Sequence, residues 1–124
     1  MIAYDQSEDP PLIAIDCKIA NPVTGIFRYG RGKFDTGAPL TFIPEKLANE
    51  LGLMPNGFVN MGDYTGNQRR HLTYIVNLHL NGFDFDGVEV AACPRQNVLI
   101  ARDLLNQLNV FLYGRQLQFD VSWP

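Results

Sequence analysis

The sequence lacks a strong excess of charge of either sign, a long apolar run and a rich supply of cysteine. Its 124 residues carry 10 basic and 13 acidic side chains, which gives a formal net charge of −3. Because binding to phosphate backbones needs a concentrated basic surface, this balance argues against nucleic acid as the main partner. No apolar stretch is long enough to span a bilayer, so no membrane association is expected. With 46% hydrophobic and 19% charged residues, the composition excludes a disordered chain and fits one globular domain.

The two cysteines, Cys17 and Cys93, would suffice for one disulfide, but no other feature indicates an oxidising compartment. Residues 1–11 contain acidic side chains and end in two prolines, unlike a secretory signal peptide with its basic and then apolar regions. We therefore expect a cytoplasmic protein with two reduced thiols. Residues 1–11 are expected to form a flexible or extended lead-in to a single domain over residues 12–124.

Neither histidine indicates a metal site. His71 and His79 lie far in the sequence from any cluster of cysteines or carboxylates, which favours exposed strand positions over metal ligation. No other motif points to a cofactor, and none is expected.

Short strands separated by turn residues dominate the pattern. Residues 72–80 alternate between two sets of side chains and end at Asn81-Gly82, which is typical of a strand that enters a hairpin. Residues 44–52 and 101–108 each predict a short helix, since leucines recur three or four positions apart. Further strands are expected at residues 12–15, 17–19, 27–29, 31–34, 40–43, 83–90, 97–100, 110–113 and 117–121. About eight strands and two short helices, without βαβ alternation, predict an all-β, closed barrel-like domain.

The most informative segment is Asp35-Thr36-Gly37-Ala38, which lies between Phe34 and the apolar run 40–43. A carboxylate among apolar residues is costly to bury unless it is paired or hydrogen-bonded. Thr36 supplies a hydroxyl group and Gly37 a backbone without Cβ, and both suit a tight turn around a carboxylate. Two interpretations of Asp35 are open: a catalytic acid or base, or a structural residue that caps a turn.

Together with its surroundings, this segment resembles the retropepsin-like aspartic proteases. The family pattern places Asp-Thr-Gly-Ala after a first hairpin, followed by an apolar strand, a small helix, a glycine-rich flap hairpin, and a short apolar strand before Arg-Asp/Asn-Leu-Leu. The corresponding segments are residues 34–38, 43–53, 61–68 and 98–105, in the same order within residues 12–121. The helix and the long strand are more similar to the non-viral, cellular or prokaryotic branch than to the viral enzymes.

The resemblance implies an aspartic endopeptidase with the retropepsin-like barrel. Since the chain has a single Asp-Thr-Gly, the second catalytic Asp would come from a second copy, and an active enzyme would be a twofold homodimer. In that enzyme the two Asp35 carboxylates act as acid and base on a water. Thr36 would bond across the twofold axis, and Gly37 would present its backbone to the carboxylate and the substrate.

The resemblance also implies which residues contact an extended peptide substrate. They are Ala38 and Ile100 in the pocket, Gly62 and Gly66 as hinges of the flap, and Tyr64 as a ligand contact. A plain surface loop is the alternative interpretation of the flap segment. The terminal segments, including residues 119–123, are expected to supply intersubunit strands, with Trp123 buried at or near the interface.

Two positions depart from the family pattern. Ala101 stands where the family has a glycine that lets the backbone pass close behind the catalytic loop. Pro39 stands where viral members have an acidic residue that pairs with the later arginine. Arg102 therefore needs another partner, either Asp103 or a backbone carbonyl. Ala101, Arg102 and Asp103 are predicted to support the site structurally.

These departures leave a second function open, namely a retropepsin-fold module that dimerises and binds peptides without cleaving them. A third interpretation is an inactive monomeric barrel in which Asp35 only caps a turn.

Overall fold

Strands make up most of the computed structural model, which describes residues 1–62 and 65–123. The helices of the described chain are short: α1 (Glu45–Glu50), α2 (Arg102–Leu105) and the 3-10 helix η1 (Gly114–Gln116). Its ten strands are β1 (Ile2–Ala3), β2 (Ala14–Ala20), β3 (Phe27–Phe34), β4 (Phe42–Pro44), β5 (Gly57–Gly62), β6 (Gln68–Leu80), β7 (Phe83–Cys93), β8 (Val98–Ile100), β9 (Asn109–Tyr113) and β10 (Gln118–Ser122). No helix within the described residues has the length and apolar character needed to cross a membrane.

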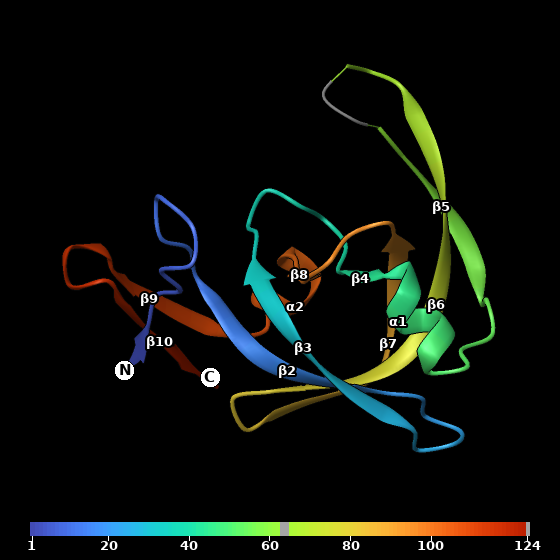
Figure 1. The fold of residues 1–124 in the computed structure, drawn as a ribbon, viewed down its shortest axis with the longest axis horizontal. Helices are drawn as coiled ribbons and strands as arrows, with labels where there is room; N and C mark the ends of the chain where they lie inside the picture. The colour runs from blue at the N-terminus through green and yellow to red at the C-terminus, as the bar shows by residue number, and fades with distance from the viewer. Residues whose placement is uncertain (63–64, 124) are drawn as a thin grey trace.

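Six strands close into a barrel. Their order is β2-β3-β8-β4-β7-β6, and β2 pairs back onto β6, so neither end of the series is free. The β3–β8 and β4–β7 pairs are parallel, and the other pairs in the barrel are antiparallel. Beyond β6, β5 completes a hairpin that projects from the barrel (Figure 1). Closure protects the strand edges of the barrel without long covering helices.

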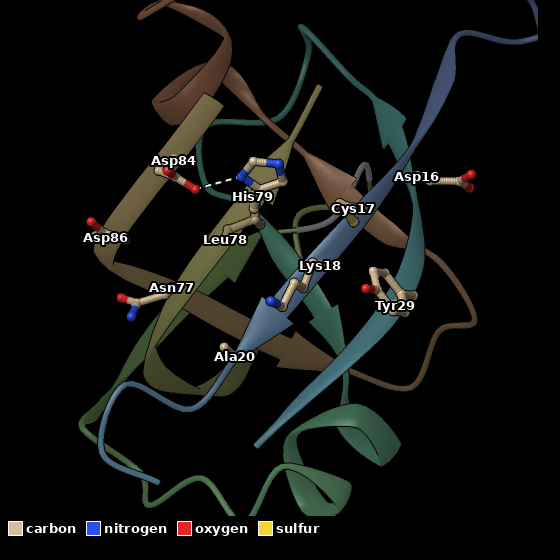
Figure 2. Close-up of a pocket in the computed structure, with 10 residues that line it drawn as sticks. All are labelled: Asp16, Cys17, Lys18, Ala20, Tyr29, Asn77, Leu78, His79, Asp84 and Asp86. Carbon is tan, nitrogen blue, oxygen red and sulfur yellow. Dashed lines mark hydrogen bonds and ion pairs between the residues drawn. The ribbon is translucent and has the colours of Figure 1, made fainter. Parts of the chain in front are cut away.

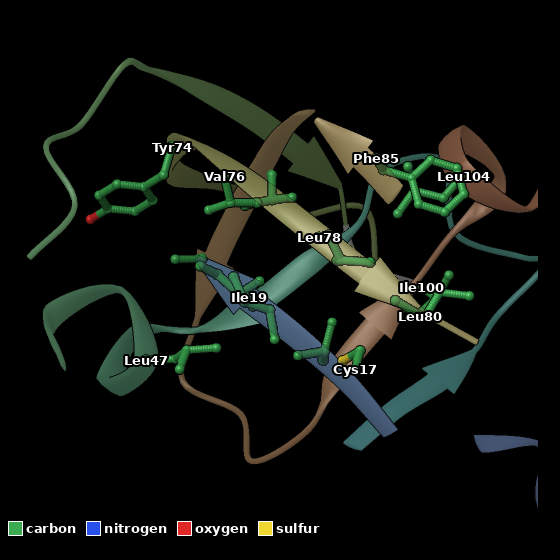
Figure 3. Packing of buried hydrophobic residues seen from close by; sticks show 14 of the residues in the cluster. Cys17, Ile19, Leu47, Tyr74, Val76, Leu78, Leu80, Phe85, Ile100 and Leu104 are labelled. Carbon is green, nitrogen blue, oxygen red and sulfur yellow. The ribbon is translucent and has the colours of Figure 1, made fainter. Parts of the chain in front are cut away.

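Apolar side chains from alternate strand positions fill the barrel. On β6, the side chains of Tyr74, Val76, Leu78 and Leu80 are buried, and Figure 3 shows them in the core. This is the period of two expected of a strand with one face inward. Leu72 continues the same series but is exposed, because that part of β6 has left the barrel and pairs only with β5.

A three-stranded sheet in the order β1-β10-β9 brings the two ends of the chain together. The middle strand β10 pairs with both neighbours, whereas β9 forms an outer edge. Residues 1–11, expected as a flexible or extended lead-in, contribute β1 to this sheet and hold a bridge between Asp5 and Leu12. Phe119 of β10 is fully buried and meets Phe34 edge-on, with 5.7 Å between the ring centres. The terminal sheet therefore packs against the end of the strand that leads into Asp35.

The expected all-β barrel with a flap hairpin and two short helices is confirmed. The described chain has ten strands, of which β4 and β8 fall in the expected segments 40–43 and 97–100. β1 was not expected, because a strand of two residues carries too little alternation to be recognised locally. Trp123 is 53% exposed in the single chain and stacks on Phe83, with 5.5 Å between the ring centres. Its burial in an interface stays a prediction.

Candidate active site

The loop that carries Asp35 connects β3 to β4 and crosses the end of β8. Phe34, the last residue of β3, pairs in parallel with Ile100, and the Asp35 amide donates a hydrogen bond to the Ile100 carbonyl at 2.9 Å. On the far side of the loop, the Arg102 amide donates to the Ala38 carbonyl at 3.0 Å. Backbone hydrogen bonds thus hold the loop at both ends. In Figure 1 it lies on the side of the barrel from which the flap hairpin rises.

Within the loop, the Asp35 carboxylate folds back over the following backbone. Its Oδ1 accepts a hydrogen bond from the Gly37 amide at 2.8 Å. A Cβ at residue 37 would lie 3.1 Å from that oxygen, which is closer than side chains normally pack. Glycine at residue 37 therefore allows the close approach of Oδ1, which any side chain at this position would push outward. Asp35 is half-buried in the single chain, while Thr36 and Gly37 are exposed beside it.

Behind the loop, the buried Thr41 and the half-buried Asp103 form a polar pair that sequence reasoning missed. The Thr41 amide donates to Asp103 Oδ2 at 3.0 Å, and the Thr41 hydroxyl donates to Asp103 Oδ1 at 2.7 Å. The same hydroxyl oxygen accepts the amide hydrogen of Ala101 at 3.2 Å. Thr41 is fully buried, so its hydroxyl connects the segment after Asp35 to the segment after β8. The only sequence signal was a hydroxyl residue inside the apolar run 40–43.

Thr41→Val is expected to lower the free energy of unfolding by about 2–3 kcal/mol, because Asp103 Oδ1 and the Ala101 amide both lose a partner in a buried place. Chemical denaturation monitored by circular dichroism measures this change. Thr24→Val, at an exposed turn, is the control: its hydroxyl accepts only the Ile26 amide at 3.2 Å, and water can replace that bond at the surface. It is expected to change stability by less than about 1 kcal/mol. Equal effects of the two substitutions would contradict the role given to Thr41.

The two departures from the family pattern affect Ala101 and Arg102, and both residues have simple local surroundings. Ala101 is fully buried with φ −103° and ψ −175°, an extended conformation that any L-residue adopts without strain. Arg102 is exposed, and its Nη1 lies 3.4 Å from the Thr36 carbonyl. Of the two predicted partners, the backbone carbonyl is the one found, because Asp103 is engaged by Thr41.

The β5–β6 hairpin is the predicted flap. Its ladder extends to the pair between Gly62 and Gln68, and Gly66 lies in the turn with φ +86°, a conformation that favours glycine. Tyr64, predicted as a ligand contact, lies outside the described residues. The structure thus brings the Asp35 loop together with residues 100–103 and places Gly62 and Gly66 on a separate, projecting hairpin.

No family model matches the sequence, and no curated protein sequence matches it either. Solved structures do match. The EIAV protease, in complex with the inhibitor HBY-793, is similar over 85% of this chain and 92% of its own, with a TM-score of 0.64 and 14% identity. A retropepsin-like aspartic protease from Rickettsia conorii is similar over 99% of this chain and 90% of its own, with a TM-score of 0.61 and 14% identity. This chain has the retropepsin-like fold.

Two further matches agree with the retropepsin-like fold. The retroviral protease-like domain of Ddi1 from Leishmania major is similar over 91% of this chain and 94% of its own, with a TM-score of 0.56 and 12% identity. The foamy viral protease-reverse transcriptase, solved with an RNA/DNA hybrid, is similar over 77% of this chain, with a TM-score of 0.56 and 21% identity. This chain spans only 12% of the length of that protein.

A cavity of about 570 Å³ lies away from the Asp35 loop of the retropepsin-like barrel. It lies over the outer face of β2, β3, β6 and β7, where Figure 2 shows Lys18, Tyr29 and the hydrogen-bonded pair of His79 and Asp84. A cleft that two subunits share is only half present in a single chain. Cavity size in one chain therefore does not identify the catalytic site of a retropepsin-like dimer, and the Asp35 loop remains the stronger candidate.

Neither cysteine has the environment of a nucleophile. Burial raises the pKa of the Cys17 thiol to about 12, and burial also raises the pKa of the Cys93 thiol. Both are free thiols, as expected, and a raised thiol pKa opposes formation of the reactive thiolate. In the part of the chain that the structure describes, no three His, Cys, Asp or Glu side chains gather into a group suited to a metal ion.

Proposed function

We propose that this chain is an aspartic endopeptidase that acts as a homodimer on extended polypeptide substrates. The observation that carries the proposal is the geometry of the Asp35 loop. It presents a half-buried carboxylate, held over the Gly37 amide, on the side of a retropepsin-like barrel from which the flap hairpin rises. The chain contains one such Asp-Thr-Gly segment, so a second copy has to supply the second carboxylate.

The proposed chemistry needs the two Asp35 carboxyl groups on opposite sides of one water molecule. Like charges at that separation cannot both ionise, so the pair shares one proton, as is general for aspartic protease dyads. The ionised carboxylate takes a proton from the water, which attacks the scissile carbonyl carbon. The protonated carboxyl group donates its proton to the carbonyl oxygen. Proton transfer to the leaving nitrogen then breaks the peptide bond and restores the shared proton.

The other loop residues hold this arrangement. Thr36 is exposed next to the carboxylate, so its side chain is available to the same loop of a second copy. Gly37 leaves space for the carboxylate, and Ala38 is half-buried in the same loop. Ile100, predicted in the pocket, has its side chain fully buried in the barrel core and supports the loop only through its carbonyl. An extended peptide would add as a strand beneath the flap hairpin, where Gly62 at the end of β5 offers backbone without a side chain.

The terminal sheet offers a contact surface for the second copy. Because β10 pairs on both sides, β1 and β9 are the edges of this sheet within the described residues, and at five residues β9 offers a longer edge than the two residues of β1. That edge exposes Phe111 (50%), Leu112 (59%) and Tyr113 (41%), and β9 contains no charged residue or proline. Edge strands that stay unpaired normally carry charged residues or proline, because these prevent pairing with other chains. Antiparallel pairing of β9 with its own copy would bury these side chains and join the two terminal sheets into one.

The hydrogen bond from the Gly37 amide to Asp35 Oδ1 also supports the interpretation of Asp35 as a turn cap, since it spans two residues as in an Asx turn. Incubation with a diverse peptide library over a broad pH range separates the alternatives. Cleavage that a pepstatin-type inhibitor blocks supports the endopeptidase. A normal dimer that cleaves nothing supports a binding module, and a strict monomer at high concentration supports the turn cap.

A further inference from the structure

The flap hairpin has two faces with different side chains. Residues paired directly across an antiparallel ladder point to the same side, and successive residues alternate. One face carries Val59, Met61, Arg69 and His71, which pair as Val59 with His71 and Met61 with Arg69. The opposite face carries Phe58, Asn60, Arg70 and Leu72.

Contacts at the base of the hairpin show which face looks toward the segment that follows the Asp35 loop. The His71 ring meets the ring of Phe42 edge-on, with 5.1 Å between their centres. Phe42 begins β4, directly after the loop that carries Asp35. On the same hairpin face as His71, Val59 is half-buried, whereas Phe58 on the opposite face is 51% exposed. We call the face with His71 the cleft face and the opposite one the outer face.

Two consecutive arginines therefore point to opposite sides of the hairpin. The Arg70 guanidinium lies 3.6 Å from the centre of the Phe58 ring, so it is held flat on the outer face. Arg69 is paired with Met61 on the cleft face, nearer the tip than His71. Because an arginine side chain is always charged, each flap carries a fixed positive charge on the side that faces the barrel.

Acidic groups of the described chain do not neutralise this charge. Both carboxylate oxygens of Asp103 accept hydrogen bonds from Thr41. Glu45 lies at the base of the hairpin, where it lines a cavity of about 270 Å³ with Arg70, His71 and Leu72, and Arg69 is not among the lining residues. Within the described residues, Arg69 forms no ion pair. A carboxylate from outside the chain is the chemical group that would match it.

We propose that Arg69 makes the enzyme prefer substrates with an Asp or Glu side chain close to the scissile bond; this inference rests on the proposed endopeptidase function. A peptide bound as an added strand alternates its side chains, so every second one points toward the cleft face. A guanidinium holds a carboxylate with two parallel hydrogen bonds, which a neutral amide cannot match in strength. In a twofold dimer both flaps carry Arg69, so the preference is expected on both sides of the cleaved bond.

The test compares peptides that carry Glu or Gln at each position near the cleaved bond, with cleavage of the mixture followed by mass spectrometry. The ratio of kcat/KM for Glu over Gln is expected to be about tenfold in the wild type, the size of one charge-assisted hydrogen bond. It is expected to fall to about one in Arg69→Gln and to stay about tenfold in Arg70→Gln, the matched control. In Arg69→Glu, peptides with Lys at the same positions are expected to be cleaved faster than peptides with Glu. Damage to the fold cannot produce such a reversal.

The outcomes distinguish a failure of the Arg69 preference from a failure of the proposed endopeptidase function. Cleavage without a preference for Glu, or with the same preference in Arg69→Gln, overturns the role of Arg69 and leaves the endopeptidase in place. Absence of cleavage of every peptide by the wild-type dimer overturns the proposed function, and the substrate preference with it.

Discussion

Asp35→Asn is expected to lower kcat/KM for peptide cleavage by at least about 1,000-fold, because an amide can neither take up nor release the transferred proton. The substitution should leave the loop intact, since an asparagine oxygen can still accept the Gly37 amide hydrogen bond that measures 2.8 Å in the wild type. The free energy of unfolding is therefore expected to change by less than about 1 kcal/mol. Initial cleavage rates and denaturation curves on the same preparations measure both quantities.

Asp84→Asn is the matched control for that experiment. Asp84 is exposed, pairs with His79, and lines the cavity on the outer face of the barrel rather than the Asp35 loop. Wild-type rates are expected for it. Full activity of Asp35→Asn, or loss of activity in Asp84→Asn at normal stability, would show that the catalytic site is not at the Asp35 loop.

Phe111→Lys is expected to weaken dimerisation by at least about 100-fold, because a charged side chain in the centre of β9 would be desolvated in the paired edge. Cleavage activity should fall with it at low protein concentration and recover as concentration rises. The monomer should tolerate the change, since residue 111 is half exposed and lies opposite Asp120 on β10, an attractive partner for lysine. Sedimentation equilibrium gives the dissociation constant, and rates measured over a dilution series give the activity of the dimer.

Val23→Lys controls for the added charge. Val23 is 92% exposed in the turn between β2 and β3, far from the terminal sheet in the fold (Figure 1). The dissociation constant of the Val23→Lys dimer is expected to equal that of the wild-type dimer. If Phe111→Lys dimerised as tightly as Val23→Lys, the β9 edge would not be the contact between subunits.

Local sequence patterns were enough to predict the elements whose residue types depend only on local burial and turn geometry. Alternation over residues 74–80 identified β6, and Asn81-Gly82 identified the turn after it. The helix expected within residues 44–52 is α1, which begins after Pro44 and is followed by Gly52 at φ +63°. The Asp35 segment identified the fold because its spacing to residues 98–105 reflects the contact between the loop and β8.

Features that depend on distant partners were not predicted. Thr41 lies in an apolar run, and its partner Asp103 is 62 residues away, so no local signal marks the pair. The partner of Arg102 was left open for the same reason. Which of β9 and β10 has a free edge follows only from the order β1-β10-β9, because in sequence they are simply the two strands of one hairpin. Pairing, rather than propensity, decides these positions.

The measurement that tests the central claim most directly is the cleavage activity of a mixture of wild-type and Asp35→Asn chains. The activity is measured once subunit exchange in the mixture is complete. If each active site needs one Asp35 from each of two chains, an equal mixture should retain about one quarter of the activity of the same amount of wild type, since only a quarter of random dimers carry both carboxylates. If each chain held a complete site, the mixture would retain about one half. The account predicts one quarter, and one half would contradict it.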